Sequence, residues 1–144
     1  IAGIWCFADS SAEFTTSCRY FDEEGSMWGQ AAKSSGFLIL NVEDLRPDSQ
    51  SIDAVLFNSI MVVSKQLKEM NILVSRFTVP GNFIGDFTGH GMFGRRSVSI
   101  IFNMDSDIKE QLNVLKIFLA DKDKEAEFNP QHIDLRILGR VYYK

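Results

Sequence analysis

The residues that could carry chemistry in this 144-residue chain are few and far apart. Two cysteines, Cys6 and Cys18, lie near the beginning, and two histidines, His90 and His132, lie far downstream. The cysteine spacing does not match the C-x-x-C pattern of zinc sites or redox centres, so we predict no metal site. From spacing alone, the two cysteines are either a disulfide that closes a short loop or two small buried thiols.

A cysteine nucleophile with a histidine base is the catalytic arrangement that these residues allow. It would bring Cys6 or Cys18 next to His132, with Asp134 on the same face of a strand. The plainer interpretation is that His132 and Asp134 are polar residues on the outer face of a terminal strand. The sequence contains no phosphate-binding loop, nucleophile elbow, zinc-protease motif or complete dinucleotide fingerprint. We therefore predict a protein that is not an enzyme and needs no cofactor.

The net charge of the chain excludes some classes of binding partner. The chain has 15 Lys and Arg residues against 19 Asp and Glu residues, and its net charge of −4 argues against a non-specific nucleic-acid binder. Arg95 and Arg96 form the one basic cluster, which is typical of a sheet edge or a surface salt bridge. The glycine-rich segment 85–94 is interpreted as a hairpin rather than an anion site, because no helix pattern follows it. No apolar run approaches the roughly 20 residues of a membrane helix.

Hydrophobic periodicity predicts several short strands and two helices. Candidate N-caps for the first helix are Asp48, Ser49 and Ser51, and Asn71 marks its end. The second helix is predicted to be capped by Asp105-Ser106-Asp107, with Glu110 three residues after Asp107 as in a capping box. The expected apolar faces are Ile52, Val55, Leu56, Ile60, Val63, Leu67 and Met70 in the first helix and Ile108, Leu112, Leu115 and Leu119 in the second.

Strands are expected at 1–6, 18–21, 26–32, 36–42, 72–79, 97–102 and 132–143, with a hairpin or loose turn at 82–91. Because helices and strands do not alternate strictly, the fold class is α+β. We expect a mixed, largely antiparallel β-sheet with two amphipathic helices packed on it.

The terminal segment 132–143 alternates between apolar and polar residues, with Ile137, Val141 and Tyr143 on the apolar face. A terminal strand at a sheet edge would offer unpaired N–H and C=O groups to a strand from another chain. Tyr142 and Tyr143, close to Arg140, are residues that protein interfaces favour.

In the C-terminal half, a helix of the form Q-L-x-x-L-x-x-F-L, beginning at Gln111, precedes His132-Ile-Asp-Leu-Arg136 and then Gly139-Arg-Val-Tyr-Tyr143. With these motifs in this order, the C-terminal half resembles the end of the FtsQ/DivIB cell-division family. Upstream, Tyr20-Phe-Asp-Glu-Glu-Gly25 is similar to the start of the β domain in that family, and Ile1-Ala-Gly-Ile-Trp5 to the tail of its POTRA domain. The resemblance implies that residues 1–6 end a POTRA-like strand and that residues 7–144 form one FtsQ-type β domain.

The resemblance also implies a non-enzymatic scaffold of bacterial cell division that helps to control septal wall synthesis. It would work at the extracytoplasmic face of the cytoplasmic membrane, held by an N-terminal transmembrane helix upstream of this chain. Its partners would be coiled-coil division proteins of the FtsB/FtsL (DivIC-like) type, bound by strand addition. The strip carried over from the family is Arg136, Ile137, Leu138, Gly139, Arg140, Val141, Tyr142 and Tyr143.

Within that strip, Arg136 is expected to form a bidentate pair with an acidic partner residue, and Gly139 to allow close backbone approach. The implied compartment favours a disulfide between Cys6 and Cys18. Two alternatives stay open: another envelope assembly module, such as a secretion or pilus platform, and a small thiol-dependent hydrolase.

Overall fold

The computed structural model describes residues 1–8, 16–32, 36, 38–47, 53–122 and 128–144. In chain order the elements are β1 (Gly3–Ala8), β2 (Thr16–Phe21), β3 (Met27–Ala31), β4 (Leu40–Asp44), α1 (Ala54–Glu69), β5 (Ile72–Val79), β6 (Asp86–Phe93), β7 (Arg96–Asn103), α2 (Ile108–Lys122), β8 (His132–Asp134) and β9 (Tyr142–Tyr143).

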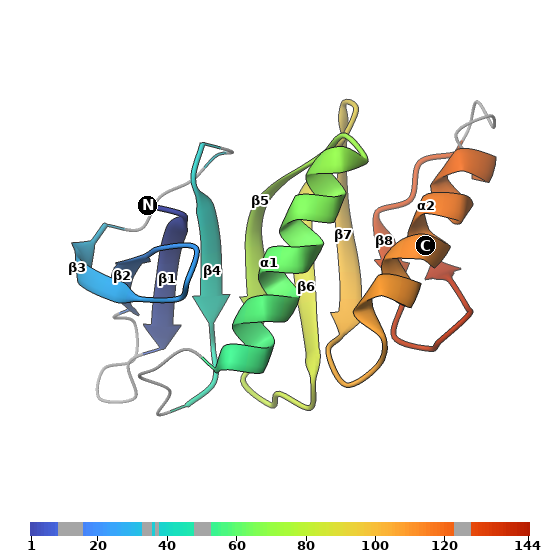
Figure 1. Ribbon diagram of the computed structural model, residues 1–144. Helices are drawn as coiled ribbons and strands as arrows, with labels where there is room; N and C mark the ends of the chain where they lie inside the picture. Colours follow the sequence, from blue (N-terminus) through green and yellow to red (C-terminus); the bar gives the residue numbers. More distant parts are fainter. Residues whose placement is uncertain (9–15, 33–35, 37, 48–52, 123–127) are drawn as a thin grey trace.

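The strands form one sheet in the order β3-β2-β1-β4-β5-β6-β7-β8-β9. Most neighbouring pairs are antiparallel, and the parallel pairs are β1–β4, β4–β5 and β7–β8. Both helices lie on the same side of the sheet, in front of it in Figure 1. The structure therefore has the α+β architecture that the sequence predicts, with the core between the helices and this face of the sheet.

The order strand, helix, parallel strand, antiparallel strand occurs twice along the described chain. The helix α1 connects the parallel strands β4 and β5, and β6 then runs antiparallel to β5. Likewise α2 connects the parallel strands β7 and β8, and β9 runs antiparallel to β8. What repeats here is the order and direction of the elements.

The helix α1 is capped by Asp53, which is not one of the predicted N-caps. The Oδ1 atom of Asp53 accepts hydrogen bonds from the backbone N–H groups of Val55 (2.9 Å) and Leu56 (3.2 Å). The candidates at 48–51 and Ile52 lie outside the described residues. The prediction that Asn71 ends the helix is confirmed, since this residue adopts a φ of 62° there. The buried face consists of Leu56, Phe57, Ile60, Val63 and Leu67, while Val55 is exposed.

The helix α2 has the predicted cap and the predicted core face. The N–H of Glu110 donates to Oδ1 of Asp107 at 3.2 Å, and Leu112, Leu115 and Leu119 are buried. Gln111 is also buried, against expectation. Its side chain exchanges hydrogen bonds with the backbone of Asn103 (2.7 and 3.0 Å), which joins α2 to the end of β7.

The domain boundary expected after residue 6 falls inside β1. Residues 3–8 form a single strand between β2 and β4, and Trp5 and Phe7 belong to the main core. In this structure β1 is paired on both sides within the one sheet, and the expected domain boundary stays a prediction.

Two strand predictions also need correction. The segment 82–91 is predicted as a hairpin or a loose turn, but Asp86–Phe93 forms one continuous strand inside the sheet. Glycine serves packing here, because a Cβ on Gly89 would lie 2.9 Å from the ring of Phe77. The strand predicted at 36–42 begins at Leu40 and ends at Asp44.

Candidate functional site

The terminal segment, expected to be one strand, is a hairpin of two short strands. The strand β8 pairs with β7, and β9 folds back onto β8. Gly139 lies between them with a φ of 75°, and the N–H of Arg140 donates to the carbonyl of Ile137 at 3.0 Å. The expected apolar face is therefore wrong at Ile137, which is 54% exposed, since the turn interrupts the alternation. A Cβ on Gly139 would meet no atom of this chain within 4 Å, so within the chain this glycine serves the turn, and the expected close approach of a partner backbone stays a prediction.

The strand β9 is the last of the described sheet and has a neighbour on one side only. The N–H of Lys144 donates to the carbonyl of His132 (3.0 Å), and the N–H of His132 donates to the carbonyl of Lys144 (3.4 Å). These two residues form a hydrogen-bonded pair, so the adjacent pair Ile133–Tyr143 is of the other type. The N–H and C=O of Tyr143 consequently point away from β8, toward the outer edge of the sheet.

The two tyrosines of β9 face opposite sides of the sheet. The ring of Tyr143 packs against Phe118 and Phe128, with ring centroids 5.1 and 5.8 Å apart, and so holds β9 against the helix layer. Tyr142 lies on the other face beside Asp134. Together with the hairpin turn, β9 exposes four large apolar side chains: Ile137, Leu138, Tyr142 and Tyr143. The predicted strip therefore combines an open backbone edge with exposed apolar surface.

Arg136, expected to meet a carboxylate of a partner, is bound within its own chain. Its Nε and Nη2 atoms donate to Oδ1 (3.0 Å) and Oδ2 (2.7 Å) of Asp134, and its backbone N–H donates to Oδ1 at 3.0 Å. This side-chain pairing is the main reason that the pKa of Asp134 is lowered and the pKa of Arg136 is raised. In this structure, therefore, the bidentate pair that we predicted with a partner residue is formed with Asp134. In addition, Nη1 of Arg136 lies 3.9 Å from Oδ2 of Asp86.

The same tripeptide occurs a second time with the same hydrogen bonds. At the end of β4, Arg46 donates from Nε (2.9 Å), Nη2 (2.7 Å) and its backbone N–H (3.1 Å) to Asp44. Asp44-Leu45-Arg46 and Asp134-Leu135-Arg136 are both visible in the sequence, and the sequence analysis missed the repetition. At the ends of both β4 and β8, the Asp-Leu-Arg tripeptide therefore forms the same set of local hydrogen bonds between its arginine and its aspartate.

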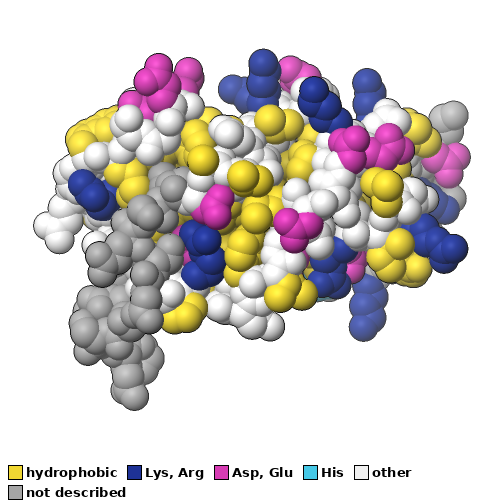
Figure 2. Space-filling model, turned by 60° about the horizontal axis from the view of Figure 1, so that its bottom comes forward, with side chains coloured by type: hydrophobic (Ala, Val, Ile, Leu, Met, Phe, Trp, Pro, Cys, Tyr) yellow, Lys and Arg dark blue, Asp and Glu magenta, His cyan; other side chains and the backbone are white. Residues whose placement is uncertain are grey.

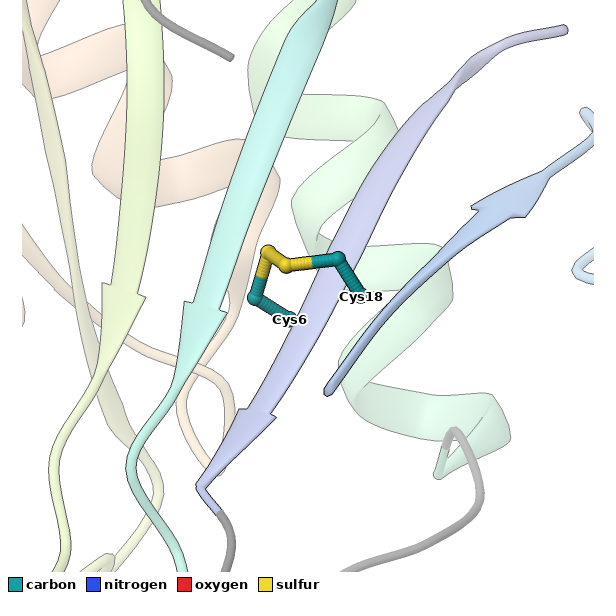
Figure 3. Close-up of a disulfide and its surroundings, with 2 residues drawn as sticks. All are labelled: Cys6 and Cys18. Carbon is teal, nitrogen blue, oxygen red and sulfur yellow. A yellow bond between two sulfur atoms is a disulfide. The ribbon is translucent and has the colours of Figure 1, made fainter. Parts of the chain in front are cut away.

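The cysteines form the disulfide that their spacing left open. Cys6 and Cys18 are directly opposite each other in the β1–β2 ladder, with Cα atoms 4.0 Å apart, and are bonded. Figure 3 shows the bond on the side of β1 that faces away from α1. Ile4 is buried with it, and Tyr20 and Ala31 pack against this small cluster.

The disulfide contradicts the arrangement of a thiol-dependent hydrolase. Both cysteines are bonded, so neither offers a thiolate. His132 lies on β8, and four strands separate β8 from β1 in the sheet. At about 4.8 Å between strands, the histidine is more than 20 Å from Cys6.

His90, to which we assigned no role from the sequence, lies at the centre of the sheet face that the helices leave open. Its Nε2 is 3.1 Å from Oγ1 of Thr78, and its Nδ1 is 3.0 Å from Oγ of Ser99. Burial, and then the charge of Arg76, lower the pKa of His90, which favours the neutral form of its ring. The sequence carried no signal for this network, because it depends on the pairing of β5, β6 and β7.

The described residues show neither a metal cluster nor a membrane span. Nowhere among them do three His, Cys, Asp or Glu side chains gather as metal ligands. Within the same residues, no helix combines the length and apolar character needed to cross a bilayer. Figure 2 shows acidic and basic side chains mixed over one face of the molecule, with hydrophobic side chains between them.

Comparison with known proteins adds no relative. No protein-family model matches the sequence, and no curated protein matches it either. The resemblance to the FtsQ/DivIB family therefore stays a prediction made from the residues.

Proposed function

We propose that this chain is a non-enzymatic binding module that accepts a strand of a partner protein along β9. The observation that carries the proposal is the outward-facing N–H and C=O of Tyr143 at the edge of the sheet. An extended segment that pairs with such an edge gains main-chain hydrogen bonds, and alternate side chains give specificity.

The side chains around β9 suit this role. The contacts of Tyr143 with Phe118 and Phe128 hold the edge in place before a partner arrives, so little ordering is required on binding. Ile137, Leu138 and Tyr142 are exposed beside it and would be covered by the incoming segment. Because β9 has only two residues, these side chains must supply much of the affinity.

In the form that the family resemblance implies, the partner is an FtsB/FtsL-type coiled-coil division protein. The module would then work at the extracytoplasmic face of the bacterial cytoplasmic membrane, carried by a transmembrane helix upstream of residue 1. The Cys6–Cys18 disulfide supports such a compartment, since disulfides persist where the surroundings are oxidising.

Binding to the cognate coiled-coil protein, measured by pull-down and titration calorimetry, tests the proposal. Tyr142→Lys replaces an exposed ring with a charge, and Val141→Pro removes an N–H next to β9; both should abolish binding. Trp28→Lys is the matched control, because Trp28 lies on the opposite edge strand β3 and is 41% exposed, against 48% for Tyr142.

Circular dichroism and thermal melting must show that the variants keep the fold. If folded Tyr142→Lys and Val141→Pro proteins bind as tightly as the unaltered chain, the β9 interface is wrong. If only Trp28→Lys loses binding, the partner docks on the opposite edge of the sheet.

A further inference from the structure

The open face of the sheet contains a groove with a single sign of charge. It has a volume of about 600 Å³ and is lined by Ser75, Arg76, His90, Gly91, Met92, Arg95, Arg96, Ser97, Val98, Ser99, Asn129, Gln131 and His132. None of these described residues is acidic. Both histidines of the chain and three of its seven arginines are among them, although the chain as a whole is acidic.

The floor of the groove is a row of residues that the sheet register places side by side. Arg76 pairs with His90, His90 with Ser99, and Ser99 with His132, across β5, β6, β7 and β8. Ser75 sits at an irregularity between Val74 and Arg76 in the β5–β6 ladder, and its hydroxyl donates to the carbonyl of His90 at 3.1 Å. With strands about 4.8 Å apart, the row spans roughly 14 Å.

The arginines that line this groove have no carboxylate partner. In the described parts of the chain, no ion pair joins Arg76, Arg95 or Arg96 to an acidic residue, and all three are exposed. Two acidic residues on neighbouring strands lie outside the lining: Glu43 on β4, whose charge acts on His90, and Asp134 on β8, which pairs with Arg136. The guanidinium groups therefore keep their donors for a ligand.

We propose that this groove binds a small polyanion, a molecule that carries two or more phosphate or carboxylate groups. Guanidinium groups pair with both kinds of anion through two parallel hydrogen bonds. More than one anionic group is required, since Arg95 and Arg96 stand at the β6–β7 turn while Arg76 and His132 lie at the two ends of the row. This proposal does not depend on the proposed function, because the groove and the β9 edge use different residues.

Titration calorimetry with two probes, tripolyphosphate and citrate, in about 150 mM NaCl tests the proposal, since salt at this level screens weak surface attraction. We expect saturable 1:1 binding of at least one probe. The double variant Arg95→Ala/Arg96→Ala should weaken it at least about tenfold, because charge-assisted hydrogen bonds are lost. Arg19→Ala/Lys109→Ala is the matched control: it removes the same charge from exposed sites outside the groove and should leave the affinity almost unchanged.

Nuclear magnetic resonance then locates the ligand, because the chain has only two histidines and their ring signals are easily resolved. Both His90 and His132 signals should shift on addition of the probe that binds. The proposal is overturned if neither probe binds, if the control double variant loses as much affinity as the groove variant, or if the histidine signals stay in place. The relative affinities of tripolyphosphate and citrate distinguish a phosphate ligand from a carboxylate ligand.

Discussion

The two Asp-Leu-Arg tripeptides allow a direct measurement of what burial adds to an ion pair. Asp44 is completely buried and also accepts a hydrogen bond from Nε1 of Trp5 at 3.2 Å, whereas the side chain of Asp134 is 26% exposed. Removal of one partner from a buried pair costs about 3–5 kcal/mol, because a charge and here also an indole N–H lose their acceptor inside the protein. Asp44→Ala should therefore cost about 3–5 kcal/mol.

Asp134→Ala removes the same three hydrogen bonds at a more exposed position. Water can replace the lost carboxylate there, and Asp86 stays 3.9 Å from Arg136, so we expect a cost of about 0–1 kcal/mol. The two variants should differ by about 3 kcal/mol, which corresponds to roughly 10 °C in melting temperature for a domain of this size.

Urea unfolding followed by circular dichroism measures both free energies, and equal m-values in the two variants show that their unfolded states are comparable. Equal destabilisation by Asp44→Ala and Asp134→Ala would falsify the claim that burial sets the value of this pairing. A loss of less than about 1 kcal/mol for Asp44→Ala would mean that Trp5 and Arg46 find other partners when the carboxylate is removed.

Three further predictions concern stability. Leu115→Ala should lower the free energy of unfolding by about 2–5 kcal/mol in urea titrations, because Leu115 is fully buried, and an unchanged value would contradict the core face of α2. The pKa of His90 is lowered in the fold from 6.5, so the unfolded chain binds its proton first; unfolding free energy should fall as the pH drops below about 6.5, and His90→Gln should reduce this slope. Cys6→Ala/Cys18→Ala should lose about 2–4 kcal/mol, and a reductant that destabilises the unaltered chain should leave this variant unaffected.

Local features of the fold were predictable where neighbouring residues decide them. The cap at Asp107, the helix end at Asn71 and the buried face of α2 follow from side chains within one or two turns, and the structure confirms them. Predictions failed where distant contacts decide. Glycines at 89 and 91 suggested a turn, but they permit a central strand because neighbouring side chains and backbone fill their space. The alternation after His132 suggested one strand, but a turn at Gly139 folds it into a hairpin.

The candidate sites also combine features that the sequence predicts with features that only the tertiary structure decides. The sequence alone predicted an interface at Tyr142 and Tyr143 and left Cys6 and Cys18 as either a disulfide or two thiols, because residue types and their spacing can be read directly from it. Only the tertiary structure decided that Tyr143 has an outward-facing backbone, that the cysteines are bonded, and that Arg76, His90 and His132 share one groove. The physical reason is that strand order and register bring together residues far apart in the chain, and a one-residue change of register would turn each side chain to the other face.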